Sequence, residues 1–234
     1  MTKPAGGVSL PLFCCAGARD AKNRGMRQTS PDFSFEKAAF ARGFARVAGV
    51  DEVGRGPLAG PVTAAAVVLD PARIPRGLND SKLLTPQRRA ALFEEIIATA
   101  DVAVAHASLA EIDRLNILRA SHLAMTRAIA LLSAPPDHVL FDGNLIPRGF
   151  TLSAEAVVKG DSRVLSIAAA SIVAKICRDR VMVDLAQQHP GYGWETNAGY
   201  ASKSHKEALQ NLGVSPHHRR SFKPIHNILY QEKS

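Results

Sequence analysis

The chain has 234 residues, of which 46% are hydrophobic and 21% charged, and its formal net charge is +8. This composition is typical of a globular protein with a sizeable core, and it excludes a disordered or fibrous chain. The positive balance indicates an anionic partner. The excess lies at the two ends, since residues 1–30 hold five basic side chains against one acidic and residues 201–234 hold six against two.

Cysteine content and hydropathy give the expected compartment. The chain has three cysteines, an odd number with two of them adjacent, which excludes a disulfide framework and favours a reducing cytosol. No apolar run approaches the about 18–20 residues that a membrane span needs. We therefore expect a cytoplasmic protein without membrane contact, and a disordered N-terminal extension over residues 1–30, which lack periodicity.

The remaining chain alternates between strand and helix patterns. Apolar runs predict strands at 45–53, 62–69, 102–107, 138–142 and 154–158. Capping and periodicity signals predict helices at 85–100, 108–132 and 162–187, with a shorter one ending at Gly213. This order predicts an α/β fold, in which ligands gather at the carboxyl ends of the strands.

Four carboxylates stand where predicted strands give way to glycine-containing chain: Asp51, Glu52, Asp142 and Asp161. If they converge, their charges repel each other strongly unless a cation intervenes. Oxygen-only ligands favour Mg²⁺ or Mn²⁺ over zinc. Two such ions side by side are a standard device for displacement at phosphorus, so the pattern indicates a phosphodiester-cleaving site.

Each acid also has an ordinary structural interpretation. Asp161 precedes a predicted helix and could be its N-cap, and Asp142 with Gly143 is a common turn pair. Neighbouring strand residues point to opposite faces, so Asp51 and Glu52 share a site only if the strand ends or bends there. The occurrence of all four acids at equivalent strand ends is what favours a catalytic interpretation.

Longer motifs make the chain resemble a known family, ribonuclease HII, in order and without gaps over about residues 44–225. The resemblance is carried by VAGVDEVGRGPLAGPVTAAAVVL (47–69), NDSKLLT (79–85), LFDGN (140–144), KGDSRVLSIAAASIVAKICRDR (159–180), GYASKSHKEAL (199–209) and HRRSF (218–222). The first and fourth segments are long and specific, which makes a chance match implausible.

The resemblance implies a fold and a reaction. The fold is ribonuclease H-like: a mixed five-stranded sheet flanked by helices forms a catalytic core over 31–200, and a basic helical segment follows over 201–234. The family hydrolyses the RNA strand of RNA–DNA hybrids. It also nicks DNA duplexes 5′ to embedded ribonucleotides and leaves 3′-hydroxyl and 5′-phosphate ends. The four acids match the family carboxylates, which use Mg²⁺ or Mn²⁺, with two ions expected in the reactive complex. We expect a monomer.

The resemblance also suggests substrate-binding residues, each with an ordinary alternative. The loop of Gly54, Arg55 and Gly56 matches the motif that senses the ribonucleotide 2′-hydroxyl, although a GxG run by itself indicates a tight turn. Tyr200 matches a tyrosine that stacks on the deoxyribose past the junction, or is a packing residue. Ser81 and Lys82 are expected to contact phosphates, or form a solvated turn. The local departure from the family pattern is Ala201-Ser202, which retains a hydroxyl.

Three other functions stay open at this point. A ribonuclease HI-like activity would need several consecutive ribonucleotides, and a duplex with one ribonucleotide separates it from the first interpretation. The sister type HIII usually carries a substantial N-terminal substrate-binding domain, for which 1–43 is short and irregular. A non-catalytic hybrid-binding module is the third alternative, but an acidic cluster would disfavour binding to a polyanion.

Overall fold

The computed structural model describes residues 30–230, so the disorder expected for residues 1–30 lies, except for Ser30, outside the described residues. The strands are β1 (Val47–Val53), β2 (Val62–Val68), β3 (Asp101–Ala107), β4 (His138–Asp142) and β5 (Ser153–Val157). The helices are α1 (Ser34–Ala41), α2 (Pro86–Thr99), α3 (Leu109–Leu115), α4 (Ile117–Ala130), α5 (Leu165–Gln188), α6 (Trp194–Asn197), α7 (Lys203–Leu212) and α8 (Lys223–Tyr230), with a 3-10 turn η1 (Gly160–Ser162) before α5. Over this range no helix combines the length and hydropathy of a membrane span.

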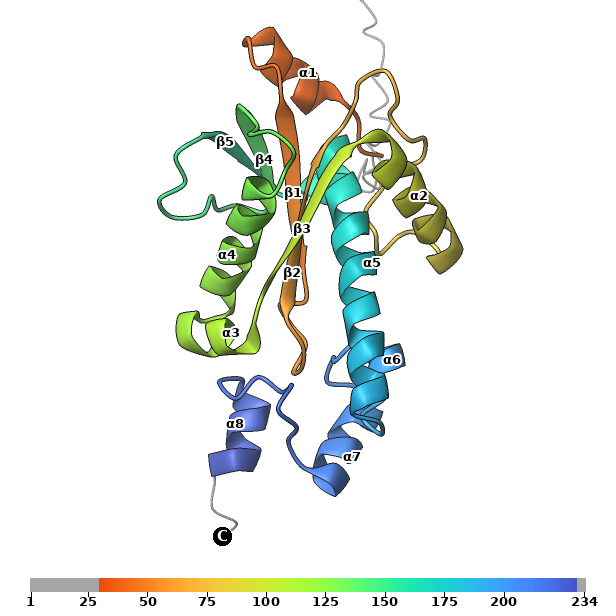
Figure 1. Cartoon of the computed structure of the whole chain (residues 1–234), viewed down its shortest axis with the longest axis vertical. Helices are drawn as coiled ribbons and strands as arrows, with labels where there is room; N and C mark the ends of the chain where they lie inside the picture. Colours follow the sequence, from red (N-terminus) through yellow and green to blue (C-terminus); the bar gives the residue numbers. More distant parts are fainter. Residues whose placement is uncertain (1–29, 231–234) are drawn as a thin grey trace, which may run out of the picture.

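The five strands form one mixed sheet in the order β3-β2-β1-β4-β5 (Figure 1). The first three strands pair in antiparallel fashion, whereas β4 runs parallel to β1 and β5 runs parallel to β4. The predicted mixed five-stranded sheet is therefore confirmed. Because β1 and β4 are parallel neighbours, their carboxyl ends meet at the same edge of the sheet.

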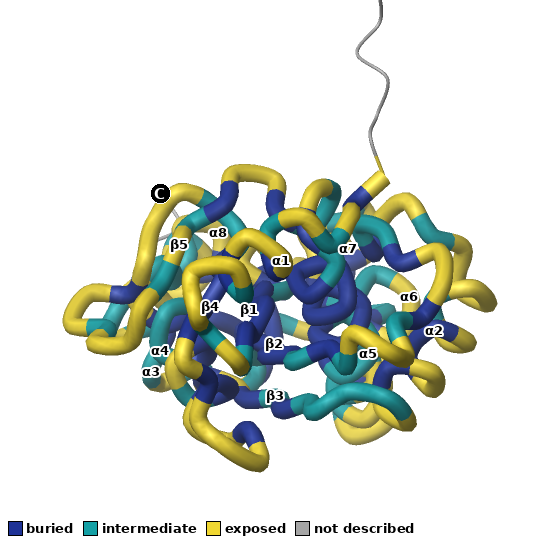
Figure 2. Tube along the Cα trace, turned by 90° about the horizontal axis from the view of Figure 1, so that it is seen from above, coloured by how far each residue is buried: buried dark blue, intermediate teal, exposed yellow. Residues whose placement is uncertain are grey.

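Helices cover both faces of this sheet, with α3 and α4 on one side and α2 and α5 on the other (Figure 1). Seen from above, the strands form a buried layer between exposed helix surfaces and loops (Figure 2). Helix α5 lies close to β1, because the fully buried Ala168–Ala170 stretch is small and a Cβ at Gly49 would stand 2.3 Å from the carbonyl carbon of Ser166. This close packing holds the start of α5 against the carboxyl ends of the central strands.

The predicted helix over 108–132 is divided in two. Ser108 and Glu111 form the expected capping box of α3, but the helix ends at Asn116, which has a φ of +69°. The Asn116 side chain then accepts a hydrogen bond from the Arg119 N–H and caps α4. A left-handed residue that caps the next helix interrupts the first one, a break that apolar periodicity across the segment did not reveal.

Helix α5 begins three residues later than expected, at Leu165 rather than Ser162. Backbone hydrogen bonds between Asp32 and the 163–165 segment hold the chain extended there, so the helix cannot start earlier. Helices α1 and α8 were not predicted. Both are short amphipathic segments of 8 residues, and they depend on packing against the rest of the fold.

The C-terminal helices form a further small core with the end of α5. Buried side chains of α6, α7 and α8 pack with Leu58 and Ala59, which lie between β1 and β2. The chain after α7 also pairs with this connection, since Ala59 forms an antiparallel bridge with His218. The expected boundary at residue 200 stays a prediction, but this contact brings residues 201–230 to the loop that follows Glu52.

Candidate active site

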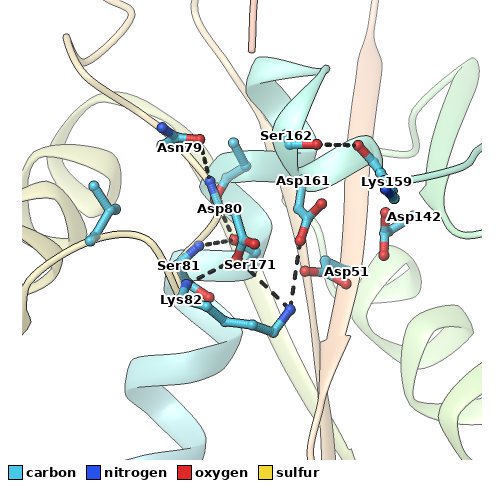
Figure 3. Close-up of polar contacts among 12 residues, drawn as sticks. Asp51, Asn79, Asp80, Ser81, Lys82, Asp142, Lys159, Asp161, Ser162 and Ser171 are labelled. Atoms are coloured by element: carbon cyan, nitrogen blue, oxygen red, sulfur yellow. Dashed lines mark hydrogen bonds and ion pairs between the residues drawn. The ribbon is translucent and has the colours of Figure 1, made fainter. Parts of the chain in front are cut away.

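Three of the four predicted carboxylates converge at the carboxyl end of the sheet. Asp51 of β1, Asp142 at the end of β4 and Asp161 of the η1 turn point toward one another (Figure 3). Asp51 is only 7% exposed. The parallel pairing of β1 with β4 explains why acids that are 91 residues apart in the sequence meet here.

Local contacts fix Asp142 and Asp161 in place. The Asp142 Oδ1 accepts a hydrogen bond of 2.7 Å from the Gly160 N–H, which ties the end of β4 to the η1 turn. Asp142 is the last residue of β4, and Gly143 after it has a φ of +101°, a conformation that favours glycine where the chain leaves the strand. Asp161 is not the N-cap of α5, a position that Val164 occupies.

Glu52 approaches the cluster from the other side of β1. The strand continues to Val53, so it does not end at Asp51, yet Glu52 lies close enough for its charge to act on Asp51 and for that of Asp142 to act on Glu52. Asp51 pairs with Ala65 of the core beneath α5, whereas Glu52 pairs with Ala64 of the core beneath α4. Opposed residues of a ladder share a face, so the two acids lie on opposite faces.

An arginine accompanies Glu52 on its face of the sheet. The Glu52 Oε1 accepts a hydrogen bond of 3.2 Å from Arg55. The structure therefore groups three of the predicted acids closely and holds the fourth beside them with a cationic partner.

The acids perturb each other electrostatically. Burial raises the pKa of Asp51 well above its ordinary value, and the charges of Glu52, Asp142 and Asp161 raise it further. Burial likewise raises the pKa of Asp161, with contributions from Asp142 and Asp80. Burial raises the pKa of Glu52, although Arg55 opposes the shift. The site thus concentrates negative charge that the nearby cations of the protein offset only in part.

Lys82 is the cation nearest to the three converging acids, and it brings one acid that the sequence reasoning missed. Its Nζ lies 3.7 Å from Asp161 and 3.8 Å from Asp80 (Figure 3). Burial lowers the pKa of Lys82, but Asp80, Asp161 and the other acids outweigh this and leave it raised. Asp80 stands directly before the two residues that the resemblance singled out, and only its proximity to Asp161 reveals its electrostatic role.

Ser81 has a mainly structural environment. It is 5% exposed, its N–H donates to the Ser171 Oγ at 3.2 Å, and its carbonyl accepts a hydrogen bond from Arg89. These contacts anchor the segment to α5 and α2, so Ser81 presents Lys82 to the acidic cluster. Phosphate contact by Ser81 stays a prediction.

The donor set fits a hard divalent cation. The converging groups are all carboxylates, and their shared repulsion is what such an ion relieves. Within residues 30–230, no three Asp, Glu, His or Cys side chains are already placed as ligands of one ion. The acids therefore require side-chain adjustment to share an ion.

The loop after β1 brings the predicted sensing residues next to this cluster. Gly54 has a φ of +94°, and a Cβ there would stand 2.2 Å from the Arg178 Nε. A Cβ on Gly56 would stand 3.5 Å from the ring of Tyr200, whose side chain is 45% exposed. Gly54 is thus required by conformation and by contact, and the exposed tyrosine ring lies beside the loop.

Two buried arginines, to which the sequence assigned no role, donate hydrogen bonds to backbone carbonyls of this loop and of the chain that follows it. Arg178 of α5 donates to the carbonyls of Ala59, Pro61 and Ala198 at 2.9–3.2 Å. Arg219 donates to the carbonyls of Gly54, Arg55, Gly60 and Pro61 at 2.6–3.2 Å. Both guanidinium groups are fully buried, so part of the C-terminal positive charge has a structural role rather than meeting solvent or nucleic acid.

The sheet order and the carboxylates at its edge define a ribonuclease H-like nuclease. Its solved relatives include ribonuclease H2 from Pyrococcus horikoshii OT3, which is 30% identical with a TM-score of 0.67 over 79% of this chain and 97% of the relative. The fold also matches Bst-RNase HIII, solved in complex with Mn²⁺, at 21% identity and a TM-score of 0.65 over 82% of this chain and 71% of that one.

Sequence comparison then gives the particular family. A sequence model described as Ribonuclease HII matches residues 48–225. Ribonuclease HII from Ruegeria sp. is 68% identical over 229 residues, covering 95% of this chain and 99% of the relative. The chain belongs to the ribonuclease HII family, and it is an endoribonuclease that acts on RNA–DNA hybrids. This membership decides against the non-catalytic alternative.

Proposed function

We propose that the chain nicks DNA duplexes on the 5′ side of an embedded ribonucleotide and leaves 3′-hydroxyl and 5′-phosphate ends, in addition to hydrolysing longer hybrids. The observation that carries this proposal is that the Gly54–Gly56 loop directly follows the strand that bears Asp51 and Glu52 and lies beside the ring of Tyr200. A site that cleaves a phosphodiester bond and also recognises the adjacent sugar can act on a single ribonucleotide, because the 2′-hydroxyl distinguishes RNA from DNA.

Asp51, Glu52, Asp142 and Asp161 are the proposed ligands of divalent cations, Mg²⁺ or Mn²⁺, with two ions in the reactive complex. When bound, such ions activate water and stabilise the leaving oxygen in phosphodiester hydrolysis. Lys82, beside Asp161, would orient the scissile phosphate by charge. It also partly offsets the acidic field that would otherwise repel the substrate backbone.

The loop and the tyrosine would select the cleavage position. Backbone groups of Gly54 and Gly56 can approach a sugar closely, since no side chain intervenes, and Arg55 is exposed for contact with the strand. The exposed face of Tyr200 offers a stacking surface for the neighbouring deoxyribose. In this proposal the loop contacts the ribonucleotide on one side of the junction, and Tyr200 contacts the deoxyribose on the other side.

The decisive experiment uses a DNA duplex that contains one ribonucleotide, incubated with Mg²⁺, with the product ends mapped. A single nick on the 5′ side of the ribonucleotide supports the proposal. Cleavage only of substrates with several consecutive ribonucleotides would favour the ribonuclease HI-like alternative. The Asp51→Asn and Asp142→Asn proteins should be inactive, and a retained nick in either would refute the assignment of the acids.

A cytoplasmic location and a monomeric state are further parts of the proposal. The nature of the substrate supports the location. Sedimentation analysis of the purified protein would test the monomer.

A further inference from the structure

Behind Tyr200 lies a buried pair of histidines that the reaction described above does not use. His205 at the start of α7 is fully buried, and His218 is 1% exposed. Their Nε2 atoms are 3.0 Å apart. Trp194 and Tyr192 pack against the pair, so water does not provide alternative partners and each ring nitrogen depends on the protein for its hydrogen bond.

The hydrogen bonds determine the proton on each ring nitrogen. The Nδ1 of His205 lies 2.8 Å from the Tyr200 carbonyl oxygen, which can only accept, so this nitrogen carries a hydrogen. The Nε2 of His205 in a neutral ring is then an acceptor. It receives the Trp194 Nε1–H at 3.1 Å.

The same assignment follows from the other end. The Nδ1 of His218 accepts from the Ser215 backbone N–H at 3.0 Å, so it carries no hydrogen. Its Nε2–H must therefore be the donor to His205. All of these hydrogen bonds can form together only when both histidine rings are neutral. A second proton on either ring would place two N–H donors opposite each other.

This pair closes a ring of contacts between Tyr200 and the Gly54–Gly56 loop. On one side His205 holds the Tyr200 carbonyl. On the other, the residue after His218 is Arg219, whose guanidinium holds the carbonyls of Gly54 and Arg55. The Leu58 carbonyl accepts from the Arg219 N–H at 2.8 Å, and the Leu58 N–H donates to the Gly199 carbonyl.

We propose that the neutral His205–His218 pair is a positioning device, which fixes Tyr200 relative to the Gly54–Gly56 loop and so sets the preference for a single ribonucleotide. This inference rests on the proposed function. A continuous hybrid offers a 2′-hydroxyl at every nucleotide, so the enzyme can still bind it in a productive position when Tyr200 is displaced. A single ribonucleotide allows only one position, in which the loop and Tyr200 must both contact the substrate. Cleavage of this substrate should therefore be more sensitive to displacement of Tyr200.

The test compares kcat/KM for a duplex with one ribonucleotide with kcat/KM for a continuous RNA–DNA hybrid. In the His218→Leu protein we expect this ratio to fall about tenfold, which is the effect of about one lost hydrogen bond. His218→Gln retains an N–H that can reach His205, and it should restore most of the ratio. His205→Gln removes the donor to Tyr200 while an acceptor remains for Trp194, so it should lower the ratio even if His218→Leu does not fold.

His138 provides the matched control. It is 1% exposed in β4, and it interacts with Arg42 and Ser153 rather than with the loop. His138→Leu should lower Tm but leave the ratio unchanged. Ratios within about twofold of the wild type for both His218→Leu and His205→Gln, with Tm lowered as in the control, would overturn the positioning role. A wild-type protein that fails to nick the one-ribonucleotide duplex would instead refute the proposed function.

Discussion

Arg219 donates a hydrogen bond of 2.6 Å to the carbonyl oxygen of Gly54, across a separation of 165 residues. The donor is fully buried and has no carboxylate within salt-bridge distance among the described residues. Its guanidinium instead donates four hydrogen bonds to backbone carbonyls of the chain after β1. The C-terminal segment therefore determines the shape of a loop at the proposed active site.

Replacing this side chain should expose that dependence. In Arg219→Lys a single ammonium cannot reach the carbonyls that the planar guanidinium serves, so buried acceptors lose their donors. We expect the free energy of unfolding to fall by about 2–4 kcal/mol, together with activity on a one-ribonucleotide duplex. Denaturant titration measures the first effect. Arg220→Lys, at the exposed neighbour, should behave like the wild type, and equal stability of both variants would contradict the role of Arg219.

Gly54 and Gly43 form a matched pair for testing the loop. Their φ angles are +94° and +95°, but a Cβ on Gly54 meets Arg178 at 2.2 Å, whereas a Cβ on Gly43 meets nothing within 4 Å. Gly43→Ala should therefore cost only the backbone strain, about 1 kcal/mol. Gly54→Ala should cost more, because Arg178 must move, and should reduce cleavage as well. Equal losses of stability in the two proteins would show that the arginine contact is unimportant.

Asp51→Asn should separate stability from activity. The buried Asp51 carboxylate is repelled by neighbouring acids, so a neutral side chain of the same shape should raise Tm in the absence of divalent ions while abolishing cleavage. Added Mg²⁺ should raise Tm of the wild type and have less effect on the variant. Asp137→Asn is the control, since that carboxylate accepts two backbone N–H bonds and its loss should lower Tm.

The same substitution has a predictable pH signature. Because the pKa of folded Asp51 is raised, the folded protein holds a proton that the unfolded chain releases near its ordinary pKa of about 4. Wild-type stability should consequently fall as pH rises through this window, and Asp51→Asn should show a smaller slope. A parallel dependence of Tm on pH in the two proteins would argue against repulsion at this site.

Sequence patterns predicted the sheet and the acids for a common reason. Buried strands need long apolar runs, and the acids are conspicuous because they end such runs, as Asp142 does in HVLFD (138–142). The break at Asn116 was missed because periodicity continues across it. Helix α8 was missed because Ile225 is buried only through packing with the end of α5.

The supporting side of the site was not predictable from residue type. Arginine and histidine in a basic tail are ordinarily exposed, and the fold alone shows that Arg219 and His218 are enclosed. The faces of Asp51 and Glu52 also needed the observed register, since the sequence predicted a strand over 45–53 but not which residues of the neighbouring strand oppose the two acids. Contacts between segments that are distant in the sequence cannot be predicted from local residue patterns.

His218 predicts a pH effect of the opposite sign to that of Asp51. Burial and the neighbouring His205 lower the pKa of His218 to about 4, from an ordinary value of 6.5, and His217 and His189 act in the same direction. The unfolded chain therefore binds the proton first as pH falls, and this contribution to stability is lost between pH 6.5 and about 4. His218→Gln should show a smaller loss of Tm over this range, and an unchanged slope would contradict a buried neutral ring.

The exposed ring of Tyr200 predicts an effect on activity without one on stability. Its side chain is 45% exposed, so Tyr200→Ala should change Tm little. Loss of stacking should cost about 1–3 kcal/mol in kcat/KM on the one-ribonucleotide duplex, a loss of about 5- to 150-fold. Tyr200→Phe keeps the ring and should retain most activity. Tyr230→Ala is the control, since that tyrosine is 59% exposed on α8, and a comparable loss of activity in this variant would show that the effect is not specific to the loop. Equal activity of Tyr200→Ala and the wild type would mean that the Gly54–Gly56 loop recognises the junction without a stacking partner.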